Sequence, residues 1–257
     1  MITAYTLFSG SGGNCTYVTC GKTEILIDAG KSCMAIERAL NALGTSLSTI
    51  SDIFITHEHS DHISGLEIIS KKYNIPVHMS RPSYERAVAN GTYLKRSAVC
   101  HEVLYQMTVG DVEIKSFEIP HDSAQNLGYI IDDGEHALGT ATDMGHITEA
   151  LAMELAKCQS VLIEANHDIK MLREGAYPQF LKERILSPRG HLSNENCARL
   201  ACFLSENGVK NITLGHLSRE NNTPSLAYDT VKGLLDFNNL TANLRVASPE
   251  EAVLITR

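Results

Sequence analysis

The sequence predicts one α/β domain in which two β-sheets pack face to face and helices cover their outer faces. Two patterns favour this architecture: short strands dominate the first part of the chain, and helices and strands then alternate twice. The third observation is size, because 257 residues with 43% hydrophobic residues supply enough apolar material for one large core. No break in composition offers a boundary, so we expect a single domain over residues 1–257.

Apolar runs broken by turn residues predict the elements of the first part of the chain. The helix over 34–43 has apolar residues at helical spacing, and the helix over 63–72 ends before Pro76. Pro82 suits the first turn of a further helix. In order, we expect strands at Ile2–Leu7, Cys15–Thr19 and Thr23–Asp28, a helix at Met34–Leu43, a strand at Ile53–Thr56, a helix at Ile63–Lys72, a strand at Val77–Met79 and a helix that begins at Ser80.

The second part begins with a region, 103–140, that is mainly strands. Asp133-Gly134 marks a hairpin between its last two strands. Ser193 is a good N-cap for a longer helix, and Thr223-Pro224 begins the last helix. The expected elements are strands at Val112–Ile119, Leu127–Ile131 and His136–Thr140, a helix at Thr148–Ala156, a strand at Ser160–Glu164, a helix at Ser193–Glu206, a strand at Ile212–Leu214, a helix from Thr223 to Leu235 and two short closing strands.

The chain is acidic, with 22 Lys plus Arg, 30 Asp plus Glu and a formal net charge of −8. This balance argues against an extended positively charged surface that binds nucleic acid, although bound divalent metal ions would supply positive charge locally. No apolar run approaches the ~20 residues that span a bilayer, so we expect no membrane partner. The start lacks the pattern of a secretory signal, and seven scattered Cys residues without a CxxC pair favour reduced thiols, so we expect a cytoplasmic protein.

The strongest chemical signal is a cluster of four potential metal ligands directly after an apolar strand. His57, His59, Asp61 and His62 fall within six positions, between that strand and a predicted helix. The first two are two residues apart, so both side chains point the same way from an extended backbone. Imidazole and carboxylate donors together suit Zn²⁺, Mn²⁺ or Fe²⁺. Solvation alone does not explain four adjacent potential ligands, so the cluster predicts a metal site.

One such cluster cannot complete two coordination spheres, so distant ligands are required. His121, Asp143 and His216 each lie just beyond an apolar run, where a sheet delivers side chains to a site at its edge. Each of the three, taken alone, is explained as an ordinary polar residue of a loop. Together with the cluster they are the candidates for the remaining ligands.

The H-x-H-x-D-H pattern of residues 57–62 resembles the signature of the metallo-β-lactamase superfamily, and the resemblance extends over essentially the whole chain. It implies a four-layer αββα sandwich with two mixed sheets and a hydroxide that bridges two metal ions. Asp28, in Leu26-Ile27-Asp28-Ala29-Gly30, matches a residue that supports the site. The resemblance implies that His57, His59 and His121 hold one metal ion, that Asp61, His62 and His216 hold the second, and that Asp143 bridges them.

Several short sequence segments are similar to those of the YycJ/WalJ branch of that superfamily, whose members are regarded as exonuclease-like phosphodiesterases. They include residues 8–14, 120–122, 141–143, 164–168, 190–194 and 215–218. The branch implies a metal-dependent phosphodiesterase or exonuclease that acts on nucleic acid, with DNA favoured, through the metal-bridging hydroxide. Two divalent metal ions are expected, Zn²⁺ or Mn²⁺ with Fe²⁺ as a third candidate, because this mixed donor set accepts several ions. No protein partner is indicated.

Besides metal binding, we expect a catalytic role for Asp61, itself a ligand, and for His191. His191 precedes a predicted helix N-terminus, which favours anions, so it is a candidate to protonate the leaving group or to bind phosphate; the alternative is a residue that only packs in a capping loop. Ser11, Asn14 and His167 are further candidates for substrate binding, although a Gly-Ser turn is often only a turn and a structural role for His167 is equally favoured.

The stretch between 167 and 191 is locally basic, which suggests contact with a phosphate backbone, although such a stretch is more often a solvated face. Its cations are Lys170, Arg173, Lys182, Arg184 and Arg189. The histidines at 78, 101, 136 and 146 are expected to be surface or strand residues without a role in the site.

Two other functions compete with the phosphodiesterase. A thioester hydrolase of the glyoxalase II type shares the same seven ligands, but only 41 residues follow His216, which is short for the helical domain of those enzymes. A metal-binding module without turnover is the other, and the full ligand set argues against it.

Overall fold

A computed structural model of the chain describes residues 1–94, 98–102 and 104–256. Within these residues, the strands form two seven-stranded sheets, ordered β14-β1-β2-β3-β4-β5-β6 and β13-β12-β11-β10-β9-β8-β7. The first sheet contains β1 (Thr3–Phe8), β2 (Cys15–Cys20), β3 (Thr23–Ile27), β4 (Asp52–Phe54), β5 (Val77–Ser80), β6 (Ala98–His101) and β14 (Val253–Leu254). The second contains β7 (Gln106–Val109), β8 (Val112–Ile119), β9 (Asn126–Asp132), β10 (Ala137–Ala141), β11 (Ser160–Glu164), β12 (Asn211–Gly215) and β13 (Asn243–Val246).

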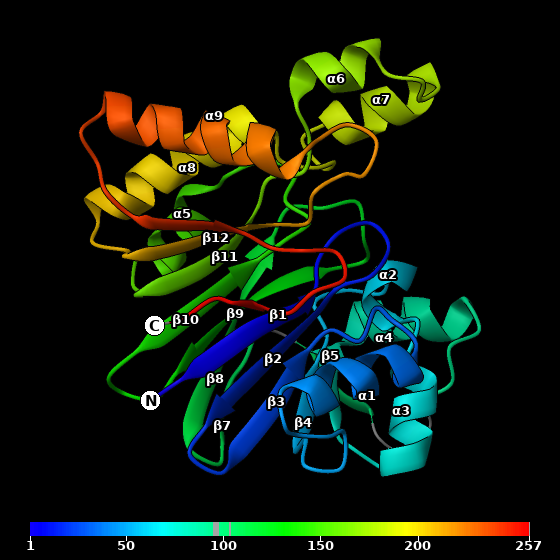
Figure 1. Cartoon of the computed structure of the whole chain (residues 1–257). Helices are drawn as coiled ribbons and strands as arrows, with labels where there is room; N and C mark the ends of the chain where they lie inside the picture. The colour runs from blue at the N-terminus through cyan, green and yellow to red at the C-terminus, as the bar shows by residue number, and fades with distance from the viewer. Residues whose placement is uncertain (95–97, 103, 257) are drawn as a thin grey trace.

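Helices cover both outer faces of this pair of sheets (Figure 1). On the first sheet lie α1 (Cys33–Ala42), α3 (Leu66–Tyr73) and α4 (Arg81–Ala89), with the short α2 (Ser60–Ile63) beside them. On the second sheet lie α5 (Glu149–Leu155), α8 (Asn194–Glu206) and α9 (Pro224–Phe237). Two further helices, α6 (Ile169–Glu174) and α7 (Gln179–Leu186), project beyond the end of the sandwich. The predicted four-layer αββα sandwich is confirmed.

Three apolar clusters hold the layers together. The one between the sheets includes Val18, Phe54, Ile114 and Tyr129, which lie on the facing sides of both sheets. The other two clusters join each sheet to its own helices. The alternation of inward and outward side chains along the strands produces this arrangement, because successive residues of a strand point to opposite faces.

The structure differs from the sequence prediction in several places. Strand β6 was not expected, and β7 lies in the strand-rich region without having been predicted as an element. The helix expected over 63–72 is divided into α2 and α3 at Gly65, whose backbone N–H donates to the carbonyl of Ala29; a Cβ at Gly65 would lie 2.0 Å from the carbonyl oxygen of Lys31. Close contact between two backbones therefore interrupts the helix. Helices α6 and α7 were not predicted, because each is short and only one residue of each is buried. Residue 103, where the strand-rich region was expected to begin, lies outside the described residues.

Parallel pairing brings the ends of several strands to the same edge. Strands β10, β11 and β12 are parallel and in register, as are β3, β4 and β5. The carboxyl ends of these strands, and the residues that follow them, therefore meet at one end of the sandwich. Six of the seven residues predicted to bind metal follow β4, β10 or β12. His121 follows β8, which runs in the same direction as β10 because both are antiparallel to β9.

Candidate metal centre

The backbone is strained where it delivers the side chains of this centre. Among the described residues, five that are not glycine have positive φ, and three of them are Asp28 (64°), Asp143 (58°) and His216 (54°). Each follows the last residue of a strand or lies within two residues of it. A left-handed backbone is uncommon for residues other than glycine, although Asp and His adopt it more readily than most, and it is maintained where the surrounding structure requires it. The strain turns these side chains inward at the edge of the sheets.

A glycine allows two loops of the centre to touch. The backbone N–H of Asn14 donates to the carbonyl of Asp61 (2.8 Å), and the N–H of Gly30 donates to the carbonyl of Asn14 (2.8 Å). A Cβ at Gly30 would lie 1.7 Å from the carbonyl oxygen of Asp61. Only glycine fits there, so the Ala29-Gly30 segment fixes the loop that carries the histidine cluster.

The first group of donors is formed by His57, His59 and His121. One ring nitrogen from each lies within 4.8 Å of the others. His57 is fully buried, and its Nε2 has no hydrogen-bond partner among the described residues. Burial, together with the neighbouring His62, lowers the pKa of His57 well below its usual range. A neutral imidazole with a buried, unpartnered nitrogen is what a metal ion requires of a ligand.

The second group contains Asp61, His62, Asp143 and His216, whose donor atoms also lie within 4.8 Å of one another. His62 Nε2 is 3.1 Å from Asp143 Oδ2, and His216 Nε2 is 3.5 Å from Asp143 Oδ1. Burial lowers the pKa of both imidazoles, but Asp143 and the other carboxylates nearby outweigh it and raise each pKa above its usual range. The carboxylates thus favour positive charge at this point, which a divalent cation provides.

The donor sets fit divalent metal ions. Three imidazoles, and a second set of two imidazoles and two carboxylates, are nitrogen and oxygen ligands of the kind that Zn²⁺, Mn²⁺ and Fe²⁺ accept. The unpartnered nitrogen of His57 supports the same conclusion, because a buried polar atom without a partner is costly.

Outer hydrogen bonds fix the orientation of the ligands. The carboxylate of Asp28 lies 2.8 Å from His62 Nδ1, which agrees with the supporting role implied for it, and the carbonyl of Gly190 lies 3.0 Å from His121 Nδ1. Such partners on the far ring nitrogen leave Nε2 free to face the metal. His216 has its partner in Glu164, a residue that sequence reasoning missed.

Glu164 is fully buried at the end of β11 and has four partners. Its Oε1 is 2.8 Å from the Nδ1 of His191 and 2.8 Å from the Nδ1 of His216. Its Oε2 accepts from the backbone N–H groups of Met144 (2.6 Å) and Leu192 (3.0 Å). Burial raises the pKa of Glu164, but the adjacent imidazoles outweigh it and hold that pKa below its usual range. The ionised carboxylate therefore orients both histidines as donors at Nδ1.

This arrangement of two donor groups at the edge of an αββα sandwich can be compared with known proteins. A family model described as "Beta-lactamase superfamily domain" matches residues 23–209. The chain belongs to the metallo-β-lactamase superfamily. Within the superfamily, exodeoxyribonuclease WalJ of Streptococcus pneumoniae strain D39 is 37% identical over 229 residues, which cover 88% of this chain and 85% of that protein. Exodeoxyribonuclease YycJ of Bacillus anthracis is 35% identical over 234 residues, covering 90% and 88%.

Solved structures of the superfamily have the same fold. The metallo-β-lactamase fold protein YhfI from Bacillus subtilis aligns with a TM-score of 0.72 at 15% identity and covers 98% of this chain and 99% of its own. The predicted family and its YycJ/WalJ branch are thus confirmed. Over the part of the chain that the structure describes, no helix is long and apolar enough to cross a membrane.

The remaining site residues predicted from this superfamily lie at different depths. His191 is next to both groups: its side chain is 18% exposed, and its ring stacks on that of His216 with centroids 5.4 Å apart. Asn14 is buried, and both amide atoms have partners within the chain, including His62 Nε2 at 3.1 Å. His167 is buried without a hydrogen-bond partner for either ring nitrogen in the described structure, and Ser11 is exposed in the Gly-rich turn. Contact of these residues with substrate stays a prediction.

Two of the five cations of the basic stretch lie near the donors. Arg189 Nε donates to the carbonyl of His121 (2.8 Å), and Arg184 Nε pairs with Asp122 (2.5 Å). Sequence reasoning missed two others, Lys31 and Arg219, which meet over the Gly-rich turn: a Cβ at Gly12 would lie 3.5 Å from Lys31 Nζ and 2.9 Å from an Arg219 guanidinium nitrogen. The histidines at 78, 101, 136 and 146 lie outside the two donor groups, as expected.

Proposed function

We propose that this protein is a metal-dependent phosphodiesterase that removes nucleotides from the ends of nucleic acid, with DNA as the favoured substrate. His57, His59 and His121 would hold one ion, Asp61, His62 and His216 would hold a second, and Asp143 would be shared by both groups. The observation that carries this proposal is the closeness of the two donor groups: Asp143 Oδ2 is 3.1 Å from His62, and its Oδ1 is 3.8 Å from Nε2 of His121. The relatives named exodeoxyribonuclease support the same function.

When bound, a pair of divalent ions supplies a nucleophilic hydroxide at neutral pH and charge stabilisation for in-line displacement at phosphorus. The residues of the chain supply the rest. Asp61, the more exposed carboxylate of the second group with 23% side-chain exposure, faces the substrate side. His191 delivers a proton to the departing oxygen from Nε2, because Glu164 holds Nδ1 and raises the pKa of His191 despite its burial.

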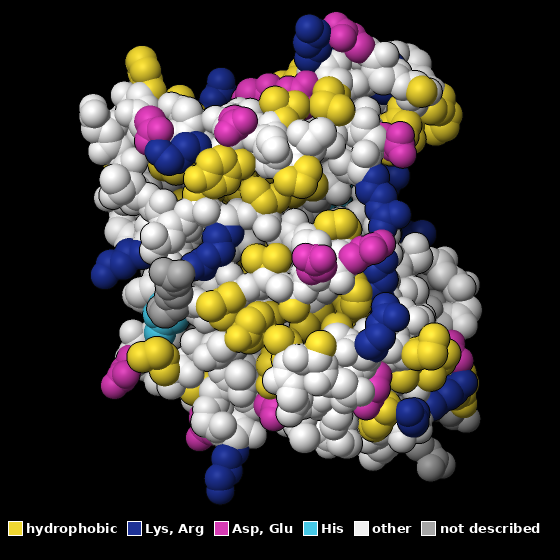
Figure 2. All heavy atoms as spheres, viewed as in Figure 1, with side chains coloured by type: hydrophobic (Ala, Val, Ile, Leu, Met, Phe, Trp, Pro, Cys, Tyr) yellow, Lys and Arg dark blue, Asp and Glu magenta, His cyan; other side chains and the backbone are white. Residues whose placement is uncertain are grey.

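Cations flank the donors on two sides and favour a polyanionic substrate. Arg184 and Arg189 lie on one side, and Lys31 and Arg219 lie on the other, over the Gly-rich turn. Figure 2 shows Lys and Arg side chains in a column on one face, below the part formed by α6 and α7. Local positive charge of this kind offsets the net charge of −8 where a phosphate backbone approaches. Ser11, Asn14 and His167 complete the proposed substrate side.

The test is hydrolysis by the purified protein loaded with Mn²⁺ or Zn²⁺. The substrates are bis-p-nitrophenyl phosphate, end-labelled single- and double-stranded DNA and RNA with 5′-phosphate or 5′-hydroxyl ends, and S-lactoylglutathione. We expect cleavage of the phosphodiesters, with mononucleotides released from DNA ends, and at least a 1,000-fold loss in Asp143→Ala and His59→Ala variants (order of magnitude for lost metal catalysis). Cleavage of the thioester alone would establish the glyoxalase II-type alternative, and metal binding without any hydrolysis would establish the non-catalytic module.

We also propose that the chain forms a single catalytic domain. Residues 1–257 act as one catalytic domain, because ligands come from both sheets, with His57 after β4 of the first sheet and His216 after β12 of the second. Reduced cysteines and a substrate of nucleic acid favour action in the cytoplasm.

A further inference from the structure

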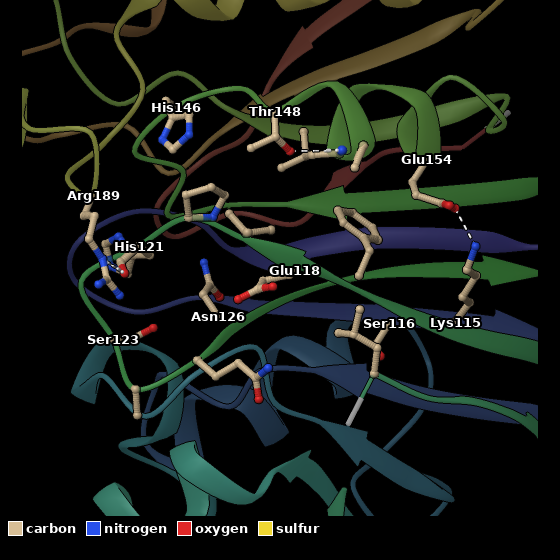
Figure 3. Close-up of a pocket in the computed structure, with 18 residues that line it drawn as sticks. Lys115, Ser116, Glu118, His121, Ser123, Asn126, His146, Thr148, Glu154 and Arg189 are labelled. Carbon is tan, nitrogen blue, oxygen red and sulfur yellow. Dashed lines mark hydrogen bonds and ion pairs between the residues drawn. The ribbon is translucent and has the colours of Figure 1, made fainter. Parts of the chain in front are cut away.

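A cavity of about 730 Å³ opens beside the first donor group, between strand β8 and helix α5. His121 and Arg189 lie at one end of it, and Lys115 and Glu154, which form a 2.7 Å ion pair, lie at the other (Figure 3). Its volume falls within the range of about 300–1,000 Å³ that small-molecule sites occupy. Because His121 belongs both to the cavity lining and to the first donor group, the cavity lies next to the metal centre.

The walls of the cavity are mainly apolar. Strand β8 contributes Phe117 and Ile119, the following turn contributes Pro120, and Leu151 faces them from α5. Strand β7 pairs with β8 as far as Lys115, and the N–H of Ser116 donates to the carbonyl of Tyr105, so only the edge of β8 beyond Ser116 faces the cavity. A wall formed by an aromatic ring and aliphatic side chains favours a ligand with an apolar or aromatic ring.

Two buried polar atoms among the lining residues have no hydrogen-bond partner in the described structure: Oδ1 of Asn126 and Oγ of Ser123. Asn126 is only 2% exposed. Its Nδ2 donates to the carbonyls of Thr142 (3.1 Å) and Asp143 (2.9 Å), which fixes Oδ1 as an unused acceptor. Buried polar groups normally have partners, so these two atoms point to a ligand that carries N–H or O–H donors.

The two cations at the ends of the cavity differ in whether they are free to contact a bound anion. Arg189 is exposed and lies beside His121 at one end of the cavity (Figure 3). Its Nε donates to the carbonyl of His121, which leaves its other guanidinium nitrogens to face an anion. Lys115 is already paired with Glu154. Glu118 adds a carboxylate acceptor near Asn126 (Figure 3). The cavity thus offers positive charge at its end beside the metal centre, and acceptors at Asn126, Ser123 and Glu118.

We propose that this cavity binds the nucleoside of the terminal nucleotide, next to the phosphodiester that is cleaved. The base stacks against Phe117 and the aliphatic walls, its N–H donors bond to Asn126 Oδ1 and Ser123 Oγ, and Arg189 contacts its phosphate. The proposal rests on the proposed function, because it assigns the substrate subsite of that same centre. It also supplies a reason for action at strand ends: the base enters the cavity only after it is unstacked from its neighbours.

The test compares two ligands on the Zn²⁺-loaded protein by isothermal titration calorimetry: 2′-deoxyadenosine 5′-monophosphate, and 2-deoxyribose 5-phosphate, which lacks the base. We expect the nucleotide to bind at least tenfold more tightly. Ala150→Trp places a large ring in the cavity and should bring this ratio close to one, whereas Met153→Trp, at an exposed position of the same helix outside the cavity, should keep it. Equal binding of the two ligands by the wild-type protein, or an unchanged ratio in Ala150→Trp, would overturn the proposal.

A second variant guards against misfolding of the first. Ser123→Ala removes a hydroxyl that has no partner within the described residues, so its thermal midpoint should be equal to or above that of the wild type. Its affinity for the nucleotide should nevertheless fall about threefold to tenfold, and unchanged affinity would count against the cavity. Hydrolysis of bis-p-nitrophenyl phosphate, which has no base, is measured in parallel. If the wild-type protein hydrolyses bis-p-nitrophenyl phosphate but binds the two ligands equally, the proposed function stands and the role of the cavity is refuted. If it binds the nucleotide more tightly but hydrolyses no phosphodiester, the proposed function is refuted.

Discussion

Replacing Glu164 with Gln tests how the centre fixes its ligands. Oε1 of Glu164 faces two imidazole Nδ1 atoms, and Oε2 faces two backbone N–H groups. A glutamine has one oxygen, so its NH₂ group must face one of these pairs. The backbone donors cannot change, whereas an imidazole can move its proton. We therefore expect the NH₂ to face His191 and His216, and both rings to carry their proton on Nε2.

The consequence for metal binding follows from the position of His216 Nε2. This atom lies 3.4 Å from Asp61 Oδ2 and 3.5 Å from Asp143 Oδ1, so it is the ligand atom of the second donor group. A protonated Nε2 cannot bind a metal ion. Loss of the outer carboxylate partner of a histidine ligand typically lowers metal affinity about 10- to 100-fold, or roughly 1.4–2.8 kcal/mol. We expect a loss of this size at one site, with the first donor group unaffected.

Titration of metal-free protein with Zn²⁺ in a calorimeter, with competing chelator, measures both affinities. The wild-type protein should give two binding events per chain, and Glu164→Gln should weaken one of them. Glu183→Gln is the matched control, because Glu183 is exposed on α7 and pairs with Gln179. Circular dichroism confirms that the variant is folded. If Glu164→Gln bound both ions within twofold of the wild type, the positioning role of Glu164 would be refuted.

Three further predictions concern stability and charge. Gly30→Ala should destabilise the protein to urea by roughly 3 kcal/mol, because its Cβ would meet backbone atoms that cannot move aside. Burial lowers the pKa of His167 from 6.5 to about 4, so between these pH values the unfolded chain binds a proton at this residue that the folded chain does not. The free energy of unfolding should therefore fall by about 3 kcal/mol from pH 7 to pH 4 because of this residue. His167→Gln should remove this contribution. A Lys31→Gln, Arg219→Gln double variant should flatten the salt dependence of single-stranded DNA binding by about 1.4 in log–log slope.

Each of these three predictions has a control variant or a result that would contradict it. Gly233→Ala, at an open position in α9, should be neutral or stabilising by about 1 kcal/mol, and equal effects at Gly30 and Gly233 would contradict the packing argument. For His167, identical pH profiles of the wild type and the variant would show that the residue does not resist protonation in the folded state. Lys232→Gln on α9 serves as the charge control, and a salt slope that the Lys31 and Arg219 changes leave intact would place the DNA elsewhere.

The donors could be predicted from the sequence because each follows a recognisable strand. His57 to His62 form a local pattern, and His121, Asp143 and His216 lie beyond apolar runs. Glu164 gave no such signal, because it is the last residue of a buried strand and acquires its role only when β11 lies between β10 and β12 in register. The sequence also gave no hint that Lys31 and Arg219 both lie beside Gly12, which depends on how distant loops come together. Tertiary proximity, rather than local pattern, determines these contacts.

Long helices were predicted from the sequence more accurately than the breaks within them. Long periodic helices such as α8 and α9 appear close to their expected limits, whereas the division between α2 and α3 depends on a contact of Gly65 with the loop that contains Ala29. A short helix such as α6, with Leu172 as its buried residue, has too little apolar periodicity to be recognised.

Metal content per chain tests the central claim most directly. Protein prepared without affinity tags or chelators, reconstituted with Zn²⁺ or Mn²⁺ and freed of excess ions, is measured by inductively coupled plasma mass spectrometry alongside an Asp143→Ala variant. Two ions per wild-type chain, and fewer in the variant, are predicted by a bridging carboxylate between two donor groups. A wild-type chain that retained no ion, or that kept the same content without Asp143, would contradict the shared centre on which the proposed hydrolysis depends.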